Sequence, residues 1–401
     1  MLNKKNNYIL TGIFSGVKTK IYLKRQMDPE NLLANDEFIK KSKCRMKIFL
    51  SLIIILFSLC IAFIILYIIE KNSSKENNEE EKKDIDNPLS LWNDCDPKNK
   101  LIEFMAKINS KEKFVPKEDR IAVFDLDGTL FQETDPTYDD WKLYYYRVYN
   151  DPNFEPTEEQ KIIADEIDIS SKNNTMPDDL NLKIAQTYAQ LFNTMTLEQY
   201  QQYIKDFVSQ PAEGYENLKR GDAFYKPMLE LIEYLQKNDF NVFISSGTDR
   251  YQVRTVIEGH INIPKGNVIG SDYEVITTNQ GEENAYEYEY KKDDEFKFEG
   301  KFLKKNLKTN KIIGIIREIG KQPLLAFGNS GGDSCMANYA INNNKYESLA
   351  FMVCCDDLER ERGNLEKAEK MKENCRINNW IAISMKDHWK TIYGENVIKK
   401  N

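Results

Sequence analysis

Four short runs without polar alternation, apolar except for Asn241, constrain the fold of this 401-residue chain more than any other feature. They are residues 121–124, 241–244, 324–327 and 349–353. A run without polar alternation is typical of a strand buried on both faces of a parallel sheet. Apolar residues at helical spacing lie between these runs, in 139–209, 228–237 and 311–319, and alternating aromatic residues in 286–302 predict a hairpin. We therefore predict an α/β fold, a three-layer Rossmann-like parallel sheet with helices on both faces.

An uncharged run from Ile48 to Ile69 dominates the N-terminal part of the chain. As a helix, its roughly 22 residues would span about 33 Å, which is enough to cross a bilayer. A signal peptide is the competing interpretation, but the run is long for one and no small-residue cleavage site follows it. We therefore divide the chain into a basic tail (1–47), a transmembrane helix (48–69), an acidic stalk (70–98) and a globular domain (99–393).

The charges on the two sides of the uncharged run predict its orientation. Lys and Arg gather between residues 40 and 47, whereas the residues after 69 are mostly acidic. The positive-inside rule then predicts a single-pass type II membrane protein with a cytosolic tail and a luminal or extracellular domain. The seven cysteines have no regular spacing, which favours the alternative of a cytosolic domain. The pattern is nevertheless compatible with one disulfide.

Composition excludes several classes of function. The net charge of −8 argues against a nucleic-acid partner, because such a protein needs a basic surface. Only two histidines are present, His260 and His388, so a histidine-rich zinc site or a Ser-His-Asp triad is hard to build. Carboxylates, of which the chain has 64, are therefore the natural source of catalytic groups.

Polar side chains follow the predicted strands at the edge of the sheet where ligands bind in parallel α/β folds. Asp125 and Asp127 come directly after the run 121–124, and two buried carboxylates are costly unless a cation or a ligand uses them. A carboxylate can also act as the nucleophile toward phosphorus.

Three further groups belong to the same predicted edge. Ser245, or else Ser246, ends the second run and could hold a phosphate oxygen. Lys311, with Lys308 as the competing candidate, begins a helix and could balance negative charge. Asn329 and Asp333 follow the third run and offer oxygen atoms to a hard cation such as Mg²⁺.

Together these segments resemble the four motifs of the haloacid dehalogenase superfamily. The matching pieces are FDLDGTL, FISSG, a lysine that begins a helix, and FGNSGGD, in that order, across roughly residues 100–388. The pattern is most similar to the branch of phosphoserine and phosphorylcholine phosphatases. The resemblance implies that the helical segment at about 133–222 is a cap inserted into the hydrolase domain 99–393.

The resemblance also implies a role for each group. Asp125 would attack phosphorus, and Asp127 would protonate the leaving group and then activate water. Ser245 or Ser246 and Lys311 would orient the phosphoryl group. Mg²⁺ would be held by Asp125, the backbone carbonyl of Asp127, Asn329 and Asp333. Many relatives carry Asp where this chain has Asn329, which bears on the affinity for the metal.

The first part of the predicted cap carries acidic and aromatic residues. Glu133 and Asp135 precede Trp141, Tyr145 and Tyr149, which share one helical face. One interpretation is that the aromatic residues form the core of the cap. The other is an acidic, aromatic box that recognises a cationic head group such as choline.

These observations predict Mg²⁺-dependent hydrolysis of a small phosphomonoester, such as phosphocholine or phosphoserine, through an aspartyl-phosphate. Two alternatives remain at this point. The chain could be a phosphomutase of the same superfamily, or a non-catalytic, membrane-anchored binding protein on the same fold. The intact pair Asp125 and Asp127 argues against the second alternative.

Overall fold

The computed structural model describes residues 88–133, 137–173, 175 and 177–400, with scattered positions between 42 and 71. The chain divides into two units, Met1–Lys83 and Asp84–Asn401. The account below concerns the second unit, which contains almost all of the described residues. Within the described residues, no helix is both long enough and apolar enough for a membrane span. Most of the predicted tail, span and stalk up to residue 87 lies outside those residues, as does Asp135, so these assignments stay predictions.

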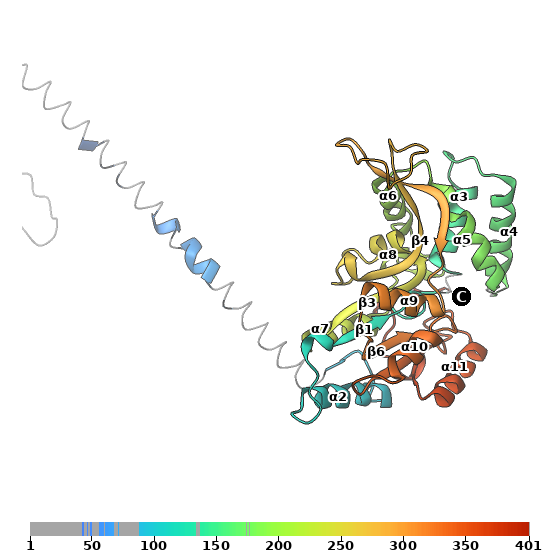
Figure 1. Ribbon diagram of the computed structural model, residues 1–401. Helices are drawn as coiled ribbons and strands as arrows, with labels where there is room; N and C mark the ends of the chain where they lie inside the picture. Colours follow the sequence, from blue (N-terminus) through green and yellow to red (C-terminus); the bar gives the residue numbers. More distant parts are fainter. Residues whose placement is uncertain are drawn as a thin grey trace, which may run out of the picture. The chain divides into compact units, whose positions relative to one another are not determined.

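A seven-stranded sheet forms the centre of the second unit, in the order β5-β4-β3-β1-β6-β7-β8 (Figure 1). Its strands are β1 Ile121–Phe124, β3 Asn241–Asp249, β4 Val268–Thr277, β5 Phe296–Lys304, β6 Leu325–Gly328, β7 Leu349–Cys354 and β8 Ile381–Ser384. All neighbouring strands pair in parallel except β4 and β5, which are antiparallel. The predicted α/β class with a mainly parallel sheet is therefore confirmed.

Helices cover both faces of this sheet. They are α2 Asp96–Asn109, α7 Lys226–Lys237, α8 Arg250–Val256, α9 Thr309–Glu318, α10 Ser334–Ile341, α11 Leu365–Asn378 and α12 Met385–His388. Along β1, Ala122 and Phe124 pack in the cluster that includes α2 and α7, whereas Ile121 and Val123 pack against α9 and α10. Alternate residues of one strand thus enter two separate apolar layers, which explains why the strand has no polar face.

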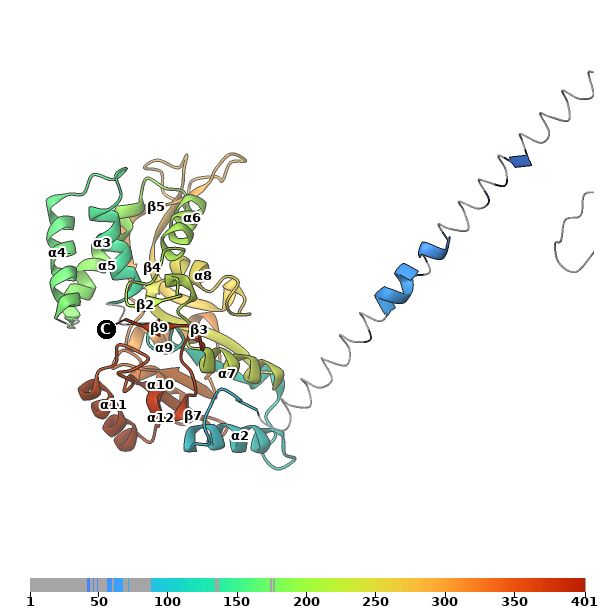
Figure 2. The same cartoon turned by 180° about the vertical axis from the view of Figure 1, so that it is seen from behind.

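Four helices form an insertion between β1 and β3. They are α3 Asp139–Tyr149, α4 Glu158–Lys172, α5 Asp178–Phe192 and α6 Leu197–Val208. Both α4 and α6 begin with a capping box, Thr157 with Gln160 and Thr196 with Gln199, in which each partner satisfies a free backbone N–H. Figures 1 and 2 show these helices gathered beside β4 and β5, away from α2 and α11.

Aromatic side chains join this helical cap to the sheet. The ring of Tyr188 on α5 lies 5.6 Å from that of Tyr273 on β4, and Tyr200 on α6 lies 5.0 Å from Phe298 on β5. Tyr188 also donates to Gln252 on α8 over 2.8 Å. The cap is therefore packed on the antiparallel edge of the sheet as well as connected to it through its two linkers.

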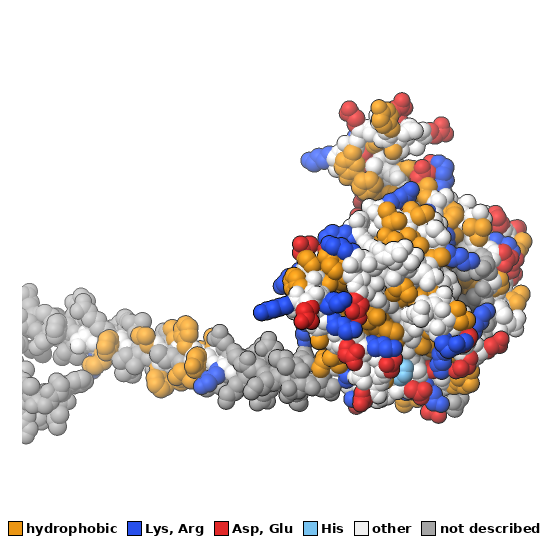
Figure 3. Space-filling model, turned by 60° about the horizontal axis from the view of Figure 1, so that its bottom comes forward, with side chains coloured by type: hydrophobic (Ala, Val, Ile, Leu, Met, Phe, Trp, Pro, Cys, Tyr) orange, Lys and Arg blue, Asp and Glu red, His pale blue; other side chains and the backbone are white. Residues whose placement is uncertain are grey.

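Short elements complete the described part. β2 Tyr215–Glu216 pairs with β9 Ile398–Lys399, and three 3-10 turns occur at Lys117–Asp119, Arg220–Asp222 and Lys265–Asn267. The five cysteines among the described residues are free thiols, namely Cys95, Cys335, Cys354, Cys355 and Cys375. On the face drawn in Figure 3, basic and acidic side chains are interspersed.

The predicted hairpin at 286–302 is only partly correct. β5 begins at Phe296 and pairs with β4, so the chain reverses over 278–295 in a loop and not in a strand around Tyr288. The carboxylate of Asp294 organises this loop, because it accepts hydrogen bonds from Asn279 Nδ2, the Tyr288 hydroxyl and Lys291 N over 2.6–3.1 Å. Local hydrogen bonds to one carboxylate here replace the ladder that the alternating pattern predicts.

Candidate active site

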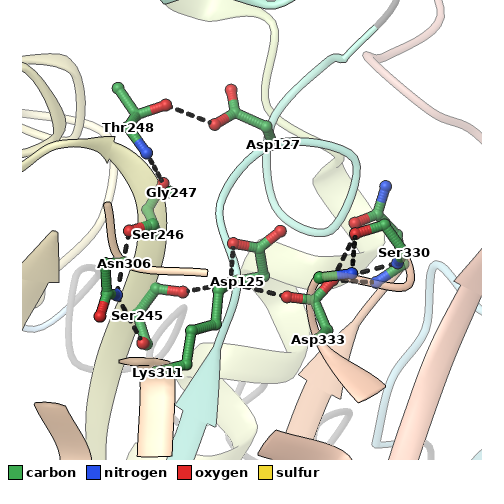
Figure 4. A network of polar contacts seen from close by, with 12 residues as sticks. Asp125, Asp127, Ser245, Ser246, Gly247, Thr248, Asn306, Lys311, Ser330 and Asp333 are labelled. Atoms are coloured by element: carbon green, nitrogen blue, oxygen red, sulfur yellow. Dashed lines mark hydrogen bonds and ion pairs between the residues drawn. The ribbon is translucent and has the colours of Figure 1, made fainter. Parts of the chain in front are cut away.

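Lys311 joins the carboxylates at the centre of the predicted site (Figure 4). Its Nζ lies 2.6 Å from Asp125 Oδ1, 2.6 Å from Asp333 Oδ1 and 2.6 Å from the carbonyl oxygen of Ser245. Asp125 directly follows β1, Asp333 lies in the loop after β6, and Ser245 lies within β3, and these three strands are neighbours in the sheet. Lys311 is the third residue of α9 and is completely buried, whereas Lys308 precedes the helix and lines the cavity above. Of the two candidate lysines, the structure therefore brings Lys311 to Asp125.

Burial makes the two aspartates of the first motif hard to ionise. Burial, and then the charge of Asp333, raises the pKa of Asp125 to about 7, although Lys311 opposes the shift. The pKa of Asp127 is raised well above its usual range by burial and then by the nearby carboxylates of Asp140 and Asp125. Asp127 is therefore suited to hold a proton at neutral pH, as a general acid must.

The oxygen atoms around Asp125 fit a hard divalent cation. Two carboxylates, Asp125 and Asp333, face one ammonium group, which leaves net negative charge in a buried place. Among the described residues, no group of three or more His, Cys, Asp or Glu side chains forms a metal cluster. A metal here would therefore need neutral oxygens as well, and the amide of Asn329 and the backbone carbonyl of Asp127 are of the type that Mg²⁺ accepts.

The loop after β6 holds Asp333 firmly. Its Oδ2 accepts hydrogen bonds from Asn329 N at 3.1 Å, Ser330 N at 3.0 Å and Ser330 Oγ at 3.1 Å. Its Oδ1 is the atom that contacts Lys311. Both oxygens of this carboxylate are thus fixed in direction by groups on the protein, as a pre-organised site requires.

The side chain of Asn329 meets Glu133, the last described residue before the loop that leads into the cap. Asn329 Nδ2 donates a hydrogen bond to Glu133 Oε2. Burial raises the pKa of the Glu133 carboxyl, and Lys367, Tyr138 and Asn329 act in the opposite direction. Gly128, at a φ of +73°, lies directly beneath the pair. A Cβ at position 128 would stand 1.9 Å from Asn329 Nδ2, so only glycine fits there.

The hydroxyl groups of Ser245 and Ser246, the two candidates for holding a phosphate oxygen, both have hydrogen-bond partners within the protein. Both are fully buried, Ser245 Oγ accepts a hydrogen bond from Asn306 Nδ2 at 3.1 Å, and Ser246 Oγ accepts one from Thr248 N at 3.1 Å. Instead, Gly247 and Thr248 line the cavity from this strand, because β3 continues to Asp249. The difference follows from the length of the strand, because the residues of β3 that line the cavity come two positions after the candidate serines.

Thr248 is the residue that sequence reasoning missed most clearly. Its Oγ1 donates to Asp127 Oδ2 over 2.9 Å, from the strand next to the one that Asp127 follows. Asn306, which secures Ser245 and the carbonyl of Ser246, was also missed. The polar run Ser245–Asp249 was a usable signal for Thr248, whereas nothing in the local pattern marks Asn306.

Two adjoining cavities lie above these groups. The first, of about 330 Å³, has Asp125, Asp127 and Asp333 at its base and Asp140 and Asn181 of the cap on its wall. The second, of about 290 Å³, is lined in part by Tyr225, Met371 and Met385. They share Tyr138, Asn329, Ser330 and Gly331 as a common wall. The site therefore offers room for a phosphoryl group and for an organic group of modest size beside it.

The sequence matches no family model and no curated protein. Similar solved structures include a conserved functionally unknown protein from Anaerococcus prevotii (14% identity, TM-score 0.44, 71% of this chain and 90% of that chain). A phosphoserine phosphohydrolase-like protein from Francisella tularensis is 14% identical, with a TM-score of 0.35 over 66% of this chain and 94% of that chain. Cytosolic 5'-nucleotidase IIIB bound to cytidine is 11% identical, with a TM-score of 0.42 over 71% of this chain and 83% of that chain. At these levels of similarity, the function has to be argued from the site itself.

Of the residues considered for an acidic, aromatic box, Asp135 lies outside the described residues, and Trp141, Tyr145 and Glu133 do not lie together around one cavity. Trp141 is completely buried in the cap core, and Tyr145 lines a separate hollow that includes Lys142 and Arg220. Glu133 instead contacts Asn329, as described above. Trp141 therefore belongs to the core of the cap, whereas Tyr149, on the same predicted face, is exposed. The aromatic residue of this segment that does line the cavity is Tyr138.

Proposed function

We propose that this chain hydrolyses a small phosphomonoester and that Asp125 carries the phosphoryl group during the reaction. The observation that carries the proposal is the contact of Lys311 Nζ with both Asp125 and Asp333 at the base of a cavity that Asp127 also lines. Phosphoryl transfer needs a nucleophile, a proton donor and fixed positive charge, and this arrangement supplies all three.

The chemistry then proceeds in two steps. A carboxylate oxygen of Asp125 attacks phosphorus, the bond to the leaving oxygen breaks, and Asp127 gives its proton to that oxygen. In the second step, Asp127 takes a proton from water, which attacks the phosphorus of the aspartyl-phosphate and releases phosphate and the free carboxylate of Asp125. Thr248 holds the carboxyl of Asp127 throughout, and Lys311 neutralises charge at Asp125.

Mg²⁺ fits this site through Asp125, Asp333, Asn329 and the carbonyl of Asp127. When bound, it would neutralise negative charge on the phosphoryl oxygens. The remaining catalytic contribution, which is the orientation of nucleophile and proton donor, comes from the residues already described.

The substrate class follows from the size of the site. Cavities of about 330 and 290 Å³ that share a wall support a metabolite-sized ester and not a macromolecule. Phosphocholine and phosphoserine are the first esters to test, together with nucleoside monophosphates and sugar phosphates. A phosphomutase would instead convert a sugar phosphate without releasing phosphate.

The membrane anchor remains a proposal that rests on the sequence. The uncharged run 48–69 and the basic residues before it support a type II orientation, with the hydrolase domain luminal or extracellular. The chemistry proposed here does not depend on that orientation.

The test is phosphate release by the purified full-length protein, in detergent, from a panel of phosphomonoesters with and without Mg²⁺. We expect at least one ester to be hydrolysed by the wild type and not by Asp125→Asn. Isomerised sugar phosphate without free phosphate would instead identify a mutase, and no turnover of any ester would contradict the proposal.

A further inference from the structure

The hydrogen bond between Asn329 and Glu133 brings together residues 196 positions apart in the sequence. Asn329 lies in the loop after β6 that also holds Asp333, and Glu133 lies in the segment that leads into the cap. No role in the two chemical steps requires Glu133. Its position beside the predicted metal loop therefore needs a separate explanation.

The hydrogen bond determines how the amide of Asn329 is turned. A carboxylate only accepts hydrogen bonds, so the NH₂ end of the amide must face Glu133. The amide oxygen, the end that can bind a hard cation, is then the one left for the metal site. Without an acceptor on that side, the amide could rotate and present its nitrogen, which is no ligand for Mg²⁺.

The backbone beneath the pair shows that the contact is built into the fold. At Gly128, a Cβ would lie 1.9 Å from Asn329 Nδ2 and 2.3 Å from Glu133 Oε2. Gly128 adopts a φ of +73°, which favours glycine independently of this contact. The turn after Asp127 is thus shaped to admit both side chains at once.

We propose that Glu133 is a positioning residue for the metal site, which orients Asn329 and supplies the negative charge that the neutral amide lacks. The inference rests on the proposed function, since it assumes that a divalent cation binds to Asp125, Asp333, Asn329 and the backbone carbonyl of Asp127. Groups that hydrogen-bond to metal ligands orient them and tune the affinity, and their loss typically weakens metal binding about 10–100-fold. Because Glu133 belongs to the segment leading into the cap, metal affinity and the position of that segment are linked.

The pair also changes what a substitution at position 329 should do. If ligand charge alone mattered, Asn329→Asp would strengthen Mg²⁺ binding. With Glu133 opposite, however, Asn329→Asp removes the hydrogen-bond donor and places two carboxylates against each other. A carboxylate at position 329 can replace the amide as a Mg²⁺ ligand only when the side chain at position 133 is neutral. This is the case in the double variant Glu133→Gln/Asn329→Asp. There the hydrogen bond is re-formed from Gln to Asp and the total charge is that of the wild type.

The experiment is a calorimetric Mg²⁺ titration of the full-length protein without substrate. The variants are Glu133→Gln, Asn329→Asp and the double variant, with Glu155→Gln, which removes an exposed carboxylate of the cap, as the matched control. We expect Glu133→Gln to weaken binding about tenfold or more. Asn329→Asp should bind Mg²⁺ no more tightly than the wild type, the double variant should return to within about threefold of it, and the control should not change. Circular dichroism on each variant verifies the fold.

Two results would overturn the inference. One is an unchanged Mg²⁺ affinity in Glu133→Gln, and the other is tighter binding by Asn329→Asp alone. If the wild type itself binds no Mg²⁺, the metal assignment of the proposed function fails together with the inference. If the wild type binds Mg²⁺ and the variants do not differ, only the role of Glu133 is wrong.

Discussion

Thr248 Oγ1 donates a hydrogen bond to Asp127 Oδ2 over 2.9 Å, and both residues are buried at the base of the cavity. Among the influences on the Asp127 carboxyl, this hydrogen bond lowers the pKa, whereas burial and neighbouring carboxylates raise it. Thr248 therefore limits how strongly the proton is held. It also fixes the direction of the Asp127 carboxyl at the base of the cavity.

Replacement of Thr248 by Val should change the pH dependence of the reaction. Loss of the hydrogen bond raises the pKa of Asp127 further, and the first step needs Asp127 protonated. The alkaline limb of kcat/KM should therefore move to higher pH, while kcat falls because the second step needs the same group deprotonated. The measurement is kcat/KM against pH. Thr255→Val, on α8 with its hydroxyl bonded to the Tyr251 carbonyl, is the control and should leave the limb in place.

Asp125→Asn should abolish turnover and leave the fold intact. The amide is nearly isosteric with the carboxylate but cannot attack phosphorus. Steady-state phosphate release and circular dichroism measure the two properties separately. Retention of more than about a tenth of the wild-type kcat would be incompatible with a covalent nucleophile at this position.

Asp127→Asn should slow the reaction by about 10²–10⁴-fold and should accumulate the phosphorylated enzyme. A substrate with a good leaving group, such as p-nitrophenyl phosphate, needs no proton donor in the first step, whereas hydrolysis of the intermediate still needs a base. Mass spectrometry of the variant after incubation with that substrate should find the phosphate on Asp125. A phosphorylated serine or histidine would refute the two-step scheme.

Gly128→Ala should destabilise the protein and remove activity together. The positive φ alone costs about 1–2 kcal/mol in a non-glycine residue, and the added Cβ also displaces Asn329 and Glu133. Gly281→Ala separates the two effects, because Gly281 has a φ of +64° with no atom within 4 Å of the added Cβ. Thermal unfolding and phosphate release should show a stability loss in both variants but an activity loss only in Gly128→Ala.

The proposed topology predicts which part of the protein a protease reaches. In sealed microsomes, added protease should remove the N-terminal tail and spare the hydrolase domain until detergent opens the membrane. Epitope tags at the two termini report the result. Digestion of the C-terminal domain without detergent would support the cytosolic alternative.

The sequence predicted the strands that continuous apolar runs reveal, and it missed those whose pattern is broken. β4 contains Gly270 and acidic residues, so it forms no continuous apolar run. The glycine is required by the fold, because a Cβ there would lie 2.6 Å from Arg250 Cα. β8, Ile381–Ser384, was missed as well.

The sequence predicted which segments of the chain meet at the site. It did not predict which of their side chains point into the cavity. Parallel strands bring their carboxyl ends to one edge, so Asp125 and Asp333 could be grouped from their places after two buried runs, and Lys311 was added through the resemblance to the four motifs. The orientation of Ser245, Ser246 and Thr248 depends on where β3 ends, which the apolar pattern does not show. Contacts such as that of Glu133 with Asn329 belong to no periodic pattern and emerge only when the chain is folded.

The aromatic contacts between the cap and the antiparallel pair β4–β5 mean that the cap is not a separable module of this protein. Tyr188 and Tyr200 share a common interior with Tyr273 and Phe298, which belong to the scaffold. Removal of the cap would expose the rings of Tyr273 and Phe298, which are now buried. A foreign cap grafted to change the specificity would therefore have to be transferred together with its own β4 and β5. In natural evolution, substitutions in the cap and in this edge of the sheet must accompany each other.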